Sequence, residues 1–233
     1  MAKWTAEQFT RELEALLGHA LVSVILYGSR AAGDHREDQS DTNLLALVRK
    51  LDVPHLKKIS KAVSAWVKQG NQPPLLLTPD HLREYVNVFP LEISDIQQNH
   101  RVLYGIDPFP ELKVPRDYLR QELEHELQGK LLQLKTRFLL TGGRNKAVIG
   151  LMTHSLSTFL VLLKNALWLY GEDPPLKKME AVKKLGERLG IRTEVFGTID
   201  LLRQGERIPG LDAAVVFEAY LETLEVFLDK IDA

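Results

Sequence analysis

The chain contains no cysteine among its 233 residues. Disulfide bonds, thiolate metal ligands and a cysteine nucleophile are therefore excluded, which fits a protein of a reducing compartment. An excess of charge of one sign is also missing, because 30 Lys and Arg residues face 31 Asp and Glu residues, for a formal charge of -1. Without a global field to attract a polynucleotide, the sequence carries no strong nucleic-acid signal.

Long uninterrupted apolar runs are absent as well. The most apolar long segment, residues 147–163, is broken by hydroxyl side chains and a histidine, and Lys164 follows it directly. It is too short and too polar for a membrane span, so we expect a buried bundle helix and no membrane partner. The first residues form an amphipathic helix pattern with Thr5 and Gln8 as a capping box, without the apolar region of a signal peptide. We therefore expect a cytoplasmic protein.

A glycine turn and a pair of candidate metal ligands occur near the start of the chain. An apolar strand over residues 22–27 leads into Gly28 and Ser29, and Asp41 and Asn43 stand at the head of a second apolar run. Gly28 lets the backbone approach an anion without a Cβ, and Ser29 adds a hydroxyl and an N–H group. Positions 41 and 43 point to the same face of a strand, where their oxygens can share divalent cations. The pattern predicts a triphosphate beside Mg²⁺ or Mn²⁺.

This stretch resembles the nucleotidyltransferases of the DNA polymerase beta superfamily, especially the small bacterial and archaeal group that includes minimal and antibiotic nucleotidyltransferases. Their pattern is an apolar strand, Gly-Ser, a loop with a further glycine, here Gly33, and Asp-x-Asp opening the next strand. In this chain the second acid is Asn43, whose amide oxygen can coordinate a metal but brings no charge. The resemblance covers roughly residues 20–105 and implies nucleotidyl transfer from an NTP with a divalent cation.

Two further side chains complete the predicted site. Arg30 follows the Gly-Ser pair, where its guanidinium can reach a phosphate, although a surface role fits it equally well. The resemblance also implies a third carboxylate from a later strand, which completes the metal site and takes the proton of the attacking hydroxyl. In a strand expected over residues 88–96, Glu92 lies opposite the apolar face, whereas Asp95 shares the apolar parity. We assign the role to Glu92; the alternatives are Asp95, if the strand ends or bulges first, and a solvated Glu92 without a role.

The order of elements divides the chain into two parts. Residues 1–110 alternate helical and strand patterns, which implies a mixed sheet with helices packed on it. Three prolines within residues 106–117 mark a boundary near residue 110, after which strand-like sequence disappears. Residues 111–233 contain amphipathic helices that need one another's apolar faces, which predicts an up-and-down bundle. The expected helices span residues 5–17, 55–68, 79–85, 119–138, 145–170, 177–189, 194–204 and 213–231, and the expected strands 22–27, 43–48, 75–78 and 88–96.

The expected fold is thus an α/β (α+β) nucleotidyltransferase-like domain, residues 1–110, followed by a helical bundle, residues 111–233, that binds the acceptor or mediates dimerisation. Polar side chains on one face of the helix over residues 145–170 are candidates for an acceptor wall. The alternative is that its hydroxyls bond back to their own helix and its histidine is a core residue. The residues of this stripe are His154, Ser157, Thr158, Asn165 and Trp168.

The expected function is transfer of a nucleoside monophosphate from an NTP to a hydroxyl group of a small molecule or a protein, with release of pyrophosphate. Gly28 and Ser29 would hold the triphosphate, while Asp41, Asn43 and Glu92 would bind Mg²⁺ or Mn²⁺, with Glu92 as the base. One alternative is a nucleotide-binding regulatory module that has lost turnover. Another is an interaction protein, such as half of a toxin–antitoxin pair, whose bundle is a surface for a homodimer or a partner.

Overall fold

The computed structural model describes residues 4–28, 30–31, 42–175 and 177–232. The chain divides into two compact units, Met1–Pro115 and Arg116–Ala233. The boundary expected near residue 110 falls in the same proline-punctuated stretch as this division.

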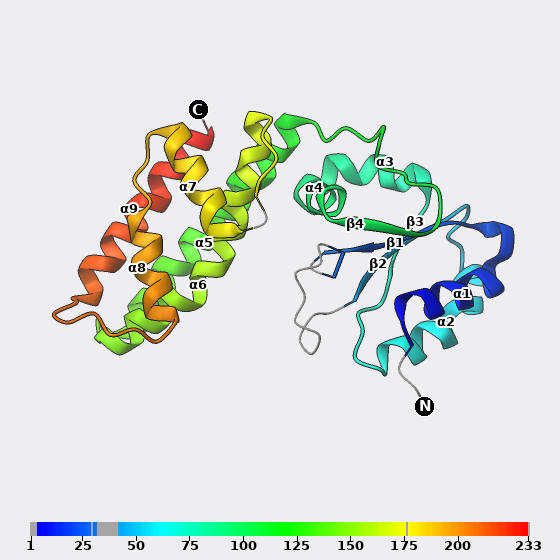
Figure 1. The fold of residues 1–233 in the computed structure, drawn as a ribbon, viewed down its shortest axis with the longest axis horizontal. Coiled ribbons are helices and arrows are strands. Elements are labelled where there is room, and N and C mark those ends of the chain that lie inside the picture. Colours follow the sequence, from blue (N-terminus) through cyan, green and yellow to red (C-terminus); the bar gives the residue numbers. More distant parts are fainter. Residues whose placement is uncertain (1–3, 29, 32–41, 176, 233) are drawn as a thin grey trace. The chain divides into compact units, whose positions relative to one another are not determined.

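The first unit is built on a mixed sheet with helices on both faces. Its elements are α1 (Ala6–Leu17), η1 (Gly18–Ala20), β1 (Leu21–Tyr27), β2 (Asn43–Val48), α2 (Val53–Val67), β3 (Leu75–Leu77), α3 (Pro79–Val88), α4 (Pro90–Gln98) and β4 (His100–Gly105). The strands lie in the order β3-β2-β1-β4; β1 is antiparallel to both its neighbours, and β2 is parallel to β3. Helices α1 and α2 cover one face, and α3 and α4 cover the other (Figure 1).

The two central strands are buried on both faces, which explains why their sequences are continuous apolar runs rather than alternating ones. Val24 points to the core shared with α1 and α2, where the rings of Phe9 and Trp66 stack 4.6 Å apart. Its neighbour Ile25 points to the opposite core, shared with Ile93 of α4. Residues at the ends of these strands are therefore held in place by packing on both sides of the sheet.

Residues 88–96 do not form the strand that the sequence predicts. They lie at the end of α3 and in α4, with Pro90 at the first position of the second helix. Proline suits that position because its φ is already helical and it has no N–H group to leave unpaired. The apolar alternation over residues 89–93 misleads because a short apolar run does not separate strand from helix. The fourth strand is instead β4, which the sequence pattern does not predict.

The other elements lie where the sequence predicts them, with ends shifted by a helical turn or less. The capping box at the start of α1 is confirmed. The side chain of Thr5 accepts a hydrogen bond from the backbone N–H of Gln8 at 3.2 Å, and the Thr5 N–H donates to the Gln8 side chain at 2.9 Å. These contacts satisfy N–H groups that the first helical turn leaves without an intrahelical partner.

The second unit is helical throughout its described residues. Its elements are α5 (Arg116–Thr141), α6 (Asn145–Ala166), η2 (Leu167–Tyr170), α7 (Lys178–Leu189), α8 (Glu194–Arg203) and α9 (Ala213–Asp232). Helix α6 packs against α5, α7, α8 and α9. Residues Asn145–Tyr170 are long and apolar enough to cross a membrane by length and composition alone. Here, however, Met152, Leu156 and Leu163 are fully buried in the bundle, as expected for a core helix.

Gly105, at the end of β4, has a backbone that only glycine adopts without strain. Its φ is +77°, and a Cβ built there would lie 2.0 Å from the carbonyl oxygen of Val22. The hydroxyl of Ser23 donates to the carbonyl oxygens on both sides of this glycine, those of Tyr104 at 3.0 Å and Ile106 at 2.8 Å. The missing side chain of Gly105 therefore lets β4 and β1 approach closely at the point where the chain leaves the sheet.

We predict that Gly105→Ala destabilises the first unit more than Gly70→Ala does. Gly70 also has a positive φ, +86°, but no atom lies within 4 Å of its Cβ position. Alanine at Gly70 should therefore cost only the left-handed strain, about 1–2 kcal/mol, whereas at Gly105 the clash with Val22 adds to it. Urea unfolding of both variants measures the difference. Equal losses would show that the close approach to Val22 does not exist in solution.

Candidate active site at the end of strand β1

Strand β1 ends in a tight turn that begins at Gly28. The φ of Gly28 is +79°, and the N–H of Ala31 donates to the Gly28 carbonyl at 2.9 Å to close the turn. The Gly28 N–H donates to the carbonyl of Asn99, just before β4, at 3.0 Å. The turn that the sequence predicts as a phosphate cradle is thus present, and glycine is required because a side chain would be strained at this φ.

Asn43 lies directly beside this turn. Its Cα is paired with that of Tyr27 across the β1–β2 ladder, and a Cβ on Gly28 would lie 3.2 Å from the Asn43 amide nitrogen. Within the described residues the half-buried Asn43 side chain makes no hydrogen bond, so its amide oxygen is available to a ligand. The structure therefore brings together one predicted phosphate-binding residue and one predicted metal ligand.

Glu92 reaches the same end of β1 from a helix rather than from a strand. It is exposed in the first turn of α4, close enough to act electrostatically on Tyr27. Burial, together with the negative charge of Glu92, raises the pKa of Tyr27. The parity argument that prefers Glu92 to Asp95 is wrong, because side chains of a helix do not alternate between two faces. The position of Glu92 beside Tyr27, and not strand parity, is the reason to prefer Glu92 to Asp95.

Three of the remaining predictions concern the turn and the metal. Ser29 and Asp41 lie outside the described residues, and Arg30 is half-buried in the turn. In the part of the chain that the structure describes, no group of three or more His, Asp or Glu side chains could hold a metal ion. The Asn43 amide and the Glu92 carboxylate offer oxygen atoms, the type of ligand that Mg²⁺ prefers, so the chemistry of both side chains suits such an ion.

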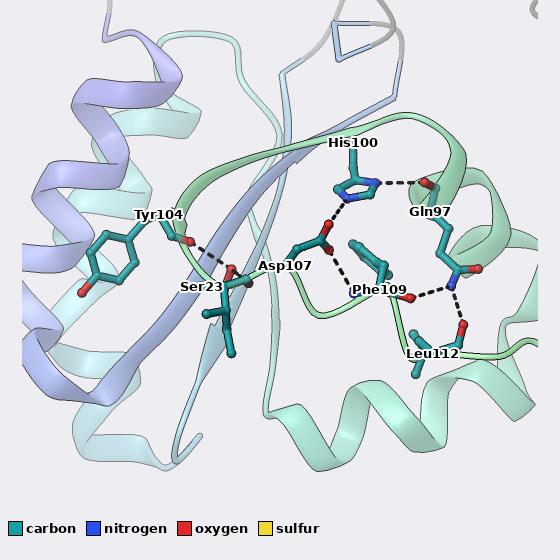
Figure 2. A network of polar contacts seen from close by, with 8 residues as sticks. Ser23, Gln97, His100, Tyr104, Asp107, Phe109 and Leu112 are labelled. Atoms are coloured by element: carbon teal, nitrogen blue, oxygen red, sulfur yellow. Dashed lines mark hydrogen bonds and ion pairs between the residues drawn. The ribbon is translucent and has the colours of Figure 1, made fainter.

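His100 is a titratable neighbour of the site that the sequence analysis missed. Its Cα is paired with that of Tyr27 on the other side of β1. One ring nitrogen, Nδ1, lies 2.9 Å from the carbonyl oxygen of Gln97, and the other, Nε2, lies 3.1 Å from the Asp107 carboxylate (Figure 2). Both partners offer acceptor oxygens, so the ring is held between two hydrogen-bonding groups.

The chain after β4 folds back towards α4 and is fixed there (Figure 2). The Gln97 amide donates to the carbonyls of Phe109 at 3.4 Å and Leu112 at 2.7 Å. The Phe109 N–H donates to the Asp107 carboxylate at 3.0 Å. The Phe109 ring packs edge-on against the His100 ring, with 4.7 Å between the ring centroids. These contacts join the start of β4 to α4. The residue just before β4 holds the Gly28 N–H, and α4 carries Glu92.

In the second unit, the predicted polar stripe of α6 is partly occupied by internal contacts. The His154 ring contacts the carbonyl of Gly150, as expected for a residue bonded back to its own helix. In contrast, Asn165 Oδ1 and Trp168 Nε1 are buried without a hydrogen-bond partner among the described residues. Buried polar atoms nearly always have a partner in a protein, in water or in a ligand. These two atoms are therefore the buried members of the stripe that lack an internal hydrogen bond.

No family model and no curated protein matches the chain. Among solved structures, it is similar to the spectinomycin adenyltransferase AAD(9) from Enterococcus faecialis, whose crystal structure contains ATP and spectinomycin. The TM-score is 0.52 at 13% sequence identity, over 95% of this chain and 100% of that chain. A likeness at this identity shows the fold. It confirms the predicted architecture, a nucleotidyltransferase-like mixed sheet with helices followed by a helical domain.

We predict that Glu92→Gln lowers the pKa of Tyr27 towards the ordinary tyrosine value. Removing the negative charge makes the phenolate less unfavourable, while the effect of burial remains, so the pKa should fall without becoming normal. An absorbance titration of the phenolate measures it, and Tyr27→Phe identifies the transition. The matched control is Asp95→Asn, which should leave the pKa of Tyr27 unchanged. A shift of the Tyr27 pKa with Asp95→Asn, and none with Glu92→Gln, would show that Asp95 and not Glu92 is the carboxylate that acts on Tyr27.

Proposed function

We propose that this protein transfers a nucleoside monophosphate from an NTP to a hydroxyl group of a small molecule and releases pyrophosphate. The observation that carries the proposal is the juxtaposition at the end of β1. Gly28, in a conformation open to an anion, lies beside Asn43, the residue in the metal-ligand position, whose amide nitrogen would be 3.2 Å from a Cβ at Gly28. A phosphate held by the turn would therefore lie beside the amide group of Asn43, whose oxygen can coordinate a cation.

Each residue has a distinct role in this proposal. The backbone at Gly28, with the hydroxyl and N–H of Ser29, holds the phosphates, and Arg30 adds positive charge beside them. Asp41, Asn43 and Glu92 would hold Mg²⁺ or Mn²⁺, which supplies neutralisation of phosphate charge when bound. Glu92 takes the proton from the acceptor hydroxyl as the hydroxyl oxygen attacks the α-phosphorus of the NTP. The bond between that phosphorus and the bridging oxygen breaks, and pyrophosphate leaves.

The acceptor is assigned by two observations of different weight. The likeness to AAD(9), which was solved with ATP and spectinomycin, spans both units and supports a small-molecule acceptor. Within the second unit, Asn165 Oδ1 and Trp168 Nε1 offer one acceptor and one donor of hydrogen bonds that no described residue uses. A polyhydroxylated molecule can satisfy both atoms, because each hydroxyl group donates and accepts.

One observation favours a second function. Asn43 brings no negative charge to the position where the resembling enzymes have their second aspartate. A site with fewer carboxylates binds a divalent cation more weakly. The protein would then bind a nucleotide without turning it over and act as a regulatory module. Binding and turnover therefore need separate tests.

We predict that the protein binds an NTP in a metal-dependent way. Asp41→Ala should abolish the dependence on Mg²⁺, because it removes the only carboxylate in the Asp-x-Asn stretch. Ser29→Ala should weaken binding by about 1 kcal/mol, the usual contribution of one hydrogen bond. Calorimetry with each NTP, with and without Mg²⁺, measures both effects. Equal affinity of the wild type and Asp41→Ala in saturating Mg²⁺ would contradict the metal assignment.

We predict that Asn43→Asp raises pyrophosphate release over a panel of NTPs and acceptors, and tightens Mn²⁺ binding. The added carboxylate supplies the charge that a hard dication gains from. In a regulatory module, the same change only adds like-charge repulsion near Asp41 and Glu92, so the melting temperature without metal should fall and no pyrophosphate should appear.

Glu92→Gln is the control for this experiment, because it keeps the size of the side chain and removes the proposed base. It should lower the rate of pyrophosphate release by about 10²–10⁴-fold, the usual contribution of a general base. Asp95→Asn, on the same helix, should change the rate little. The transferase proposal fails if neither the wild type nor Asn43→Asp releases pyrophosphate and neither is stabilised by metal.

A further inference from the structure

Helix α5 carries a second line of large side chains on the face turned away from the bundle core. Tyr118, Leu132 and Leu139 are 44%, 67% and 76% exposed, and His125 is also exposed. These four residues, which we call the outer seam, follow one another at intervals of seven. The spacing is that of a coiled-coil seam, which keeps side chains on one face along a helix. The helix also has an inner line of buried leucines, at positions 119, 123, 127, 131 and 134.

Gly129 lies on the same outer face, half way along the outer seam. A glycine inside a helix is less favourable than alanine, because it loses more backbone freedom on folding. Packing within the described chain does not require it, since no atom lies within 4 Å of its Cβ position. The space beside Gly129 would let a second backbone approach α5 from outside.

We propose that the outer seam pairs with the outer seam of a second copy of the chain, with the two α5 helices antiparallel. The seam is symmetric about one point: Tyr118 and Leu139 are centred between residues 128 and 129, and so are His125 and Leu132. A two-fold axis at that point places Tyr118 against Leu139 of the second copy, and His125 against Leu132. The helices then approach most closely beside Gly129, where no side chain is in the way.

The charges along this face favour a second copy over a charged partner. Among the residues that flank the seam, Gln121, Gln128 and Thr136 are uncharged, whereas Glu122 and Lys135 carry opposite charges. Lys135, at the margin, is paired with Glu225 of α9 at 2.7 Å. The two-fold axis places Lys135 opposite residues 121–122 of the second copy and not opposite itself. Like charges therefore do not meet in the antiparallel pair.

The absence of cysteine makes the proposed register directly testable, because each introduced thiol is the only one in its chain. Near the axis, Gln128→Cys lies opposite its own copy and should form a disulfide-linked dimer on mild oxidation. Leu139→Cys should not link to itself, since the two-fold places it opposite Tyr118. A mixture of Leu139→Cys and Tyr118→Cys should give the mixed disulfide. Self-linking of Leu139→Cys would indicate parallel helices, in which every position faces its own copy, and would overturn the proposal.

The oligomeric state of the full chain tests the seam without cross-linking. Analytical ultracentrifugation should find a dimer for the wild type and a monomer for Leu132→Lys, which places a charge in the seam. The matched control is Val215→Lys on α9, which removes an apolar side chain of similar exposure, 61%, and should remain dimeric. A wild-type monomer at high concentration, as expected if another protein or the first unit covers the seam, would overturn the proposal.

Gly129→Ala separates the proposal from a merely exposed helix face. Alanine should raise the melting temperature of the monomeric Leu132→Lys background, because the helix gains from it and nothing clashes. In the wild-type background it should raise the dissociation constant of the dimer at least tenfold, because the methyl group separates the two helices. An unchanged dissociation constant would show that the helices do not cross at Gly129.

Discussion

The antiparallel pairing of β1 with β2 is the constraint on which the candidate site depends. It places Tyr27 opposite Asn43, and so brings Gly28 against the Asn43 side chain. The register is fixed by burial, because the next pair along the ladder, Leu26 and Leu44, is 5% and 1% exposed. A slip of one residue would turn every buried side chain of the strand to the wrong face of the sheet. The apolar core therefore sets the position of the polar groups at the end of the strand.

The second neighbour of β1 sets the charges around the same point. Asn99, just before β4, accepts a hydrogen bond from the Gly28 N–H, and β4 holds His100 beside Tyr27, while the Glu92 carboxylate of α4 helps to raise the pKa of that tyrosine. The contacts among Gln97, Asp107 and the residues after β4 tie these two elements together. An acid and a histidine with two hydrogen-bond acceptors are thus fixed near the turn at Gly28 by elements of the first unit.

The second unit offers two surfaces that its own core does not explain. Its inside contains three buried side-chain polar atoms that have no hydrogen-bond partner among the described residues, Glu124 Oε1, Asn165 Oδ1 and Trp168 Nε1. On its outside, α5 presents apolar side chains and a glycine at coiled-coil spacing. The buried leucines of α5 form its contact with the bundle core, and the outer seam lies outside that core. The helix is therefore built to pack on two sides, inward in the bundle and outward against a copy of itself.

The sequence by itself determined the elements whose signals are local: the capping box at Thr5, the strands that lead into Gly28 and out of Asn43, and the helices of the second half. The same patterns, with the Gly-Ser and Asp-x-Asn stretch, predicted the fold class. Only the tertiary structure decided the rest. Whether residues 89–98 are strand or helix depends on packing, because a short apolar run fits both. The places of Glu92 and His100 then follow from how α4 and β4 pack beside β1, and long-range contacts of that kind leave no periodic trace in a single sequence.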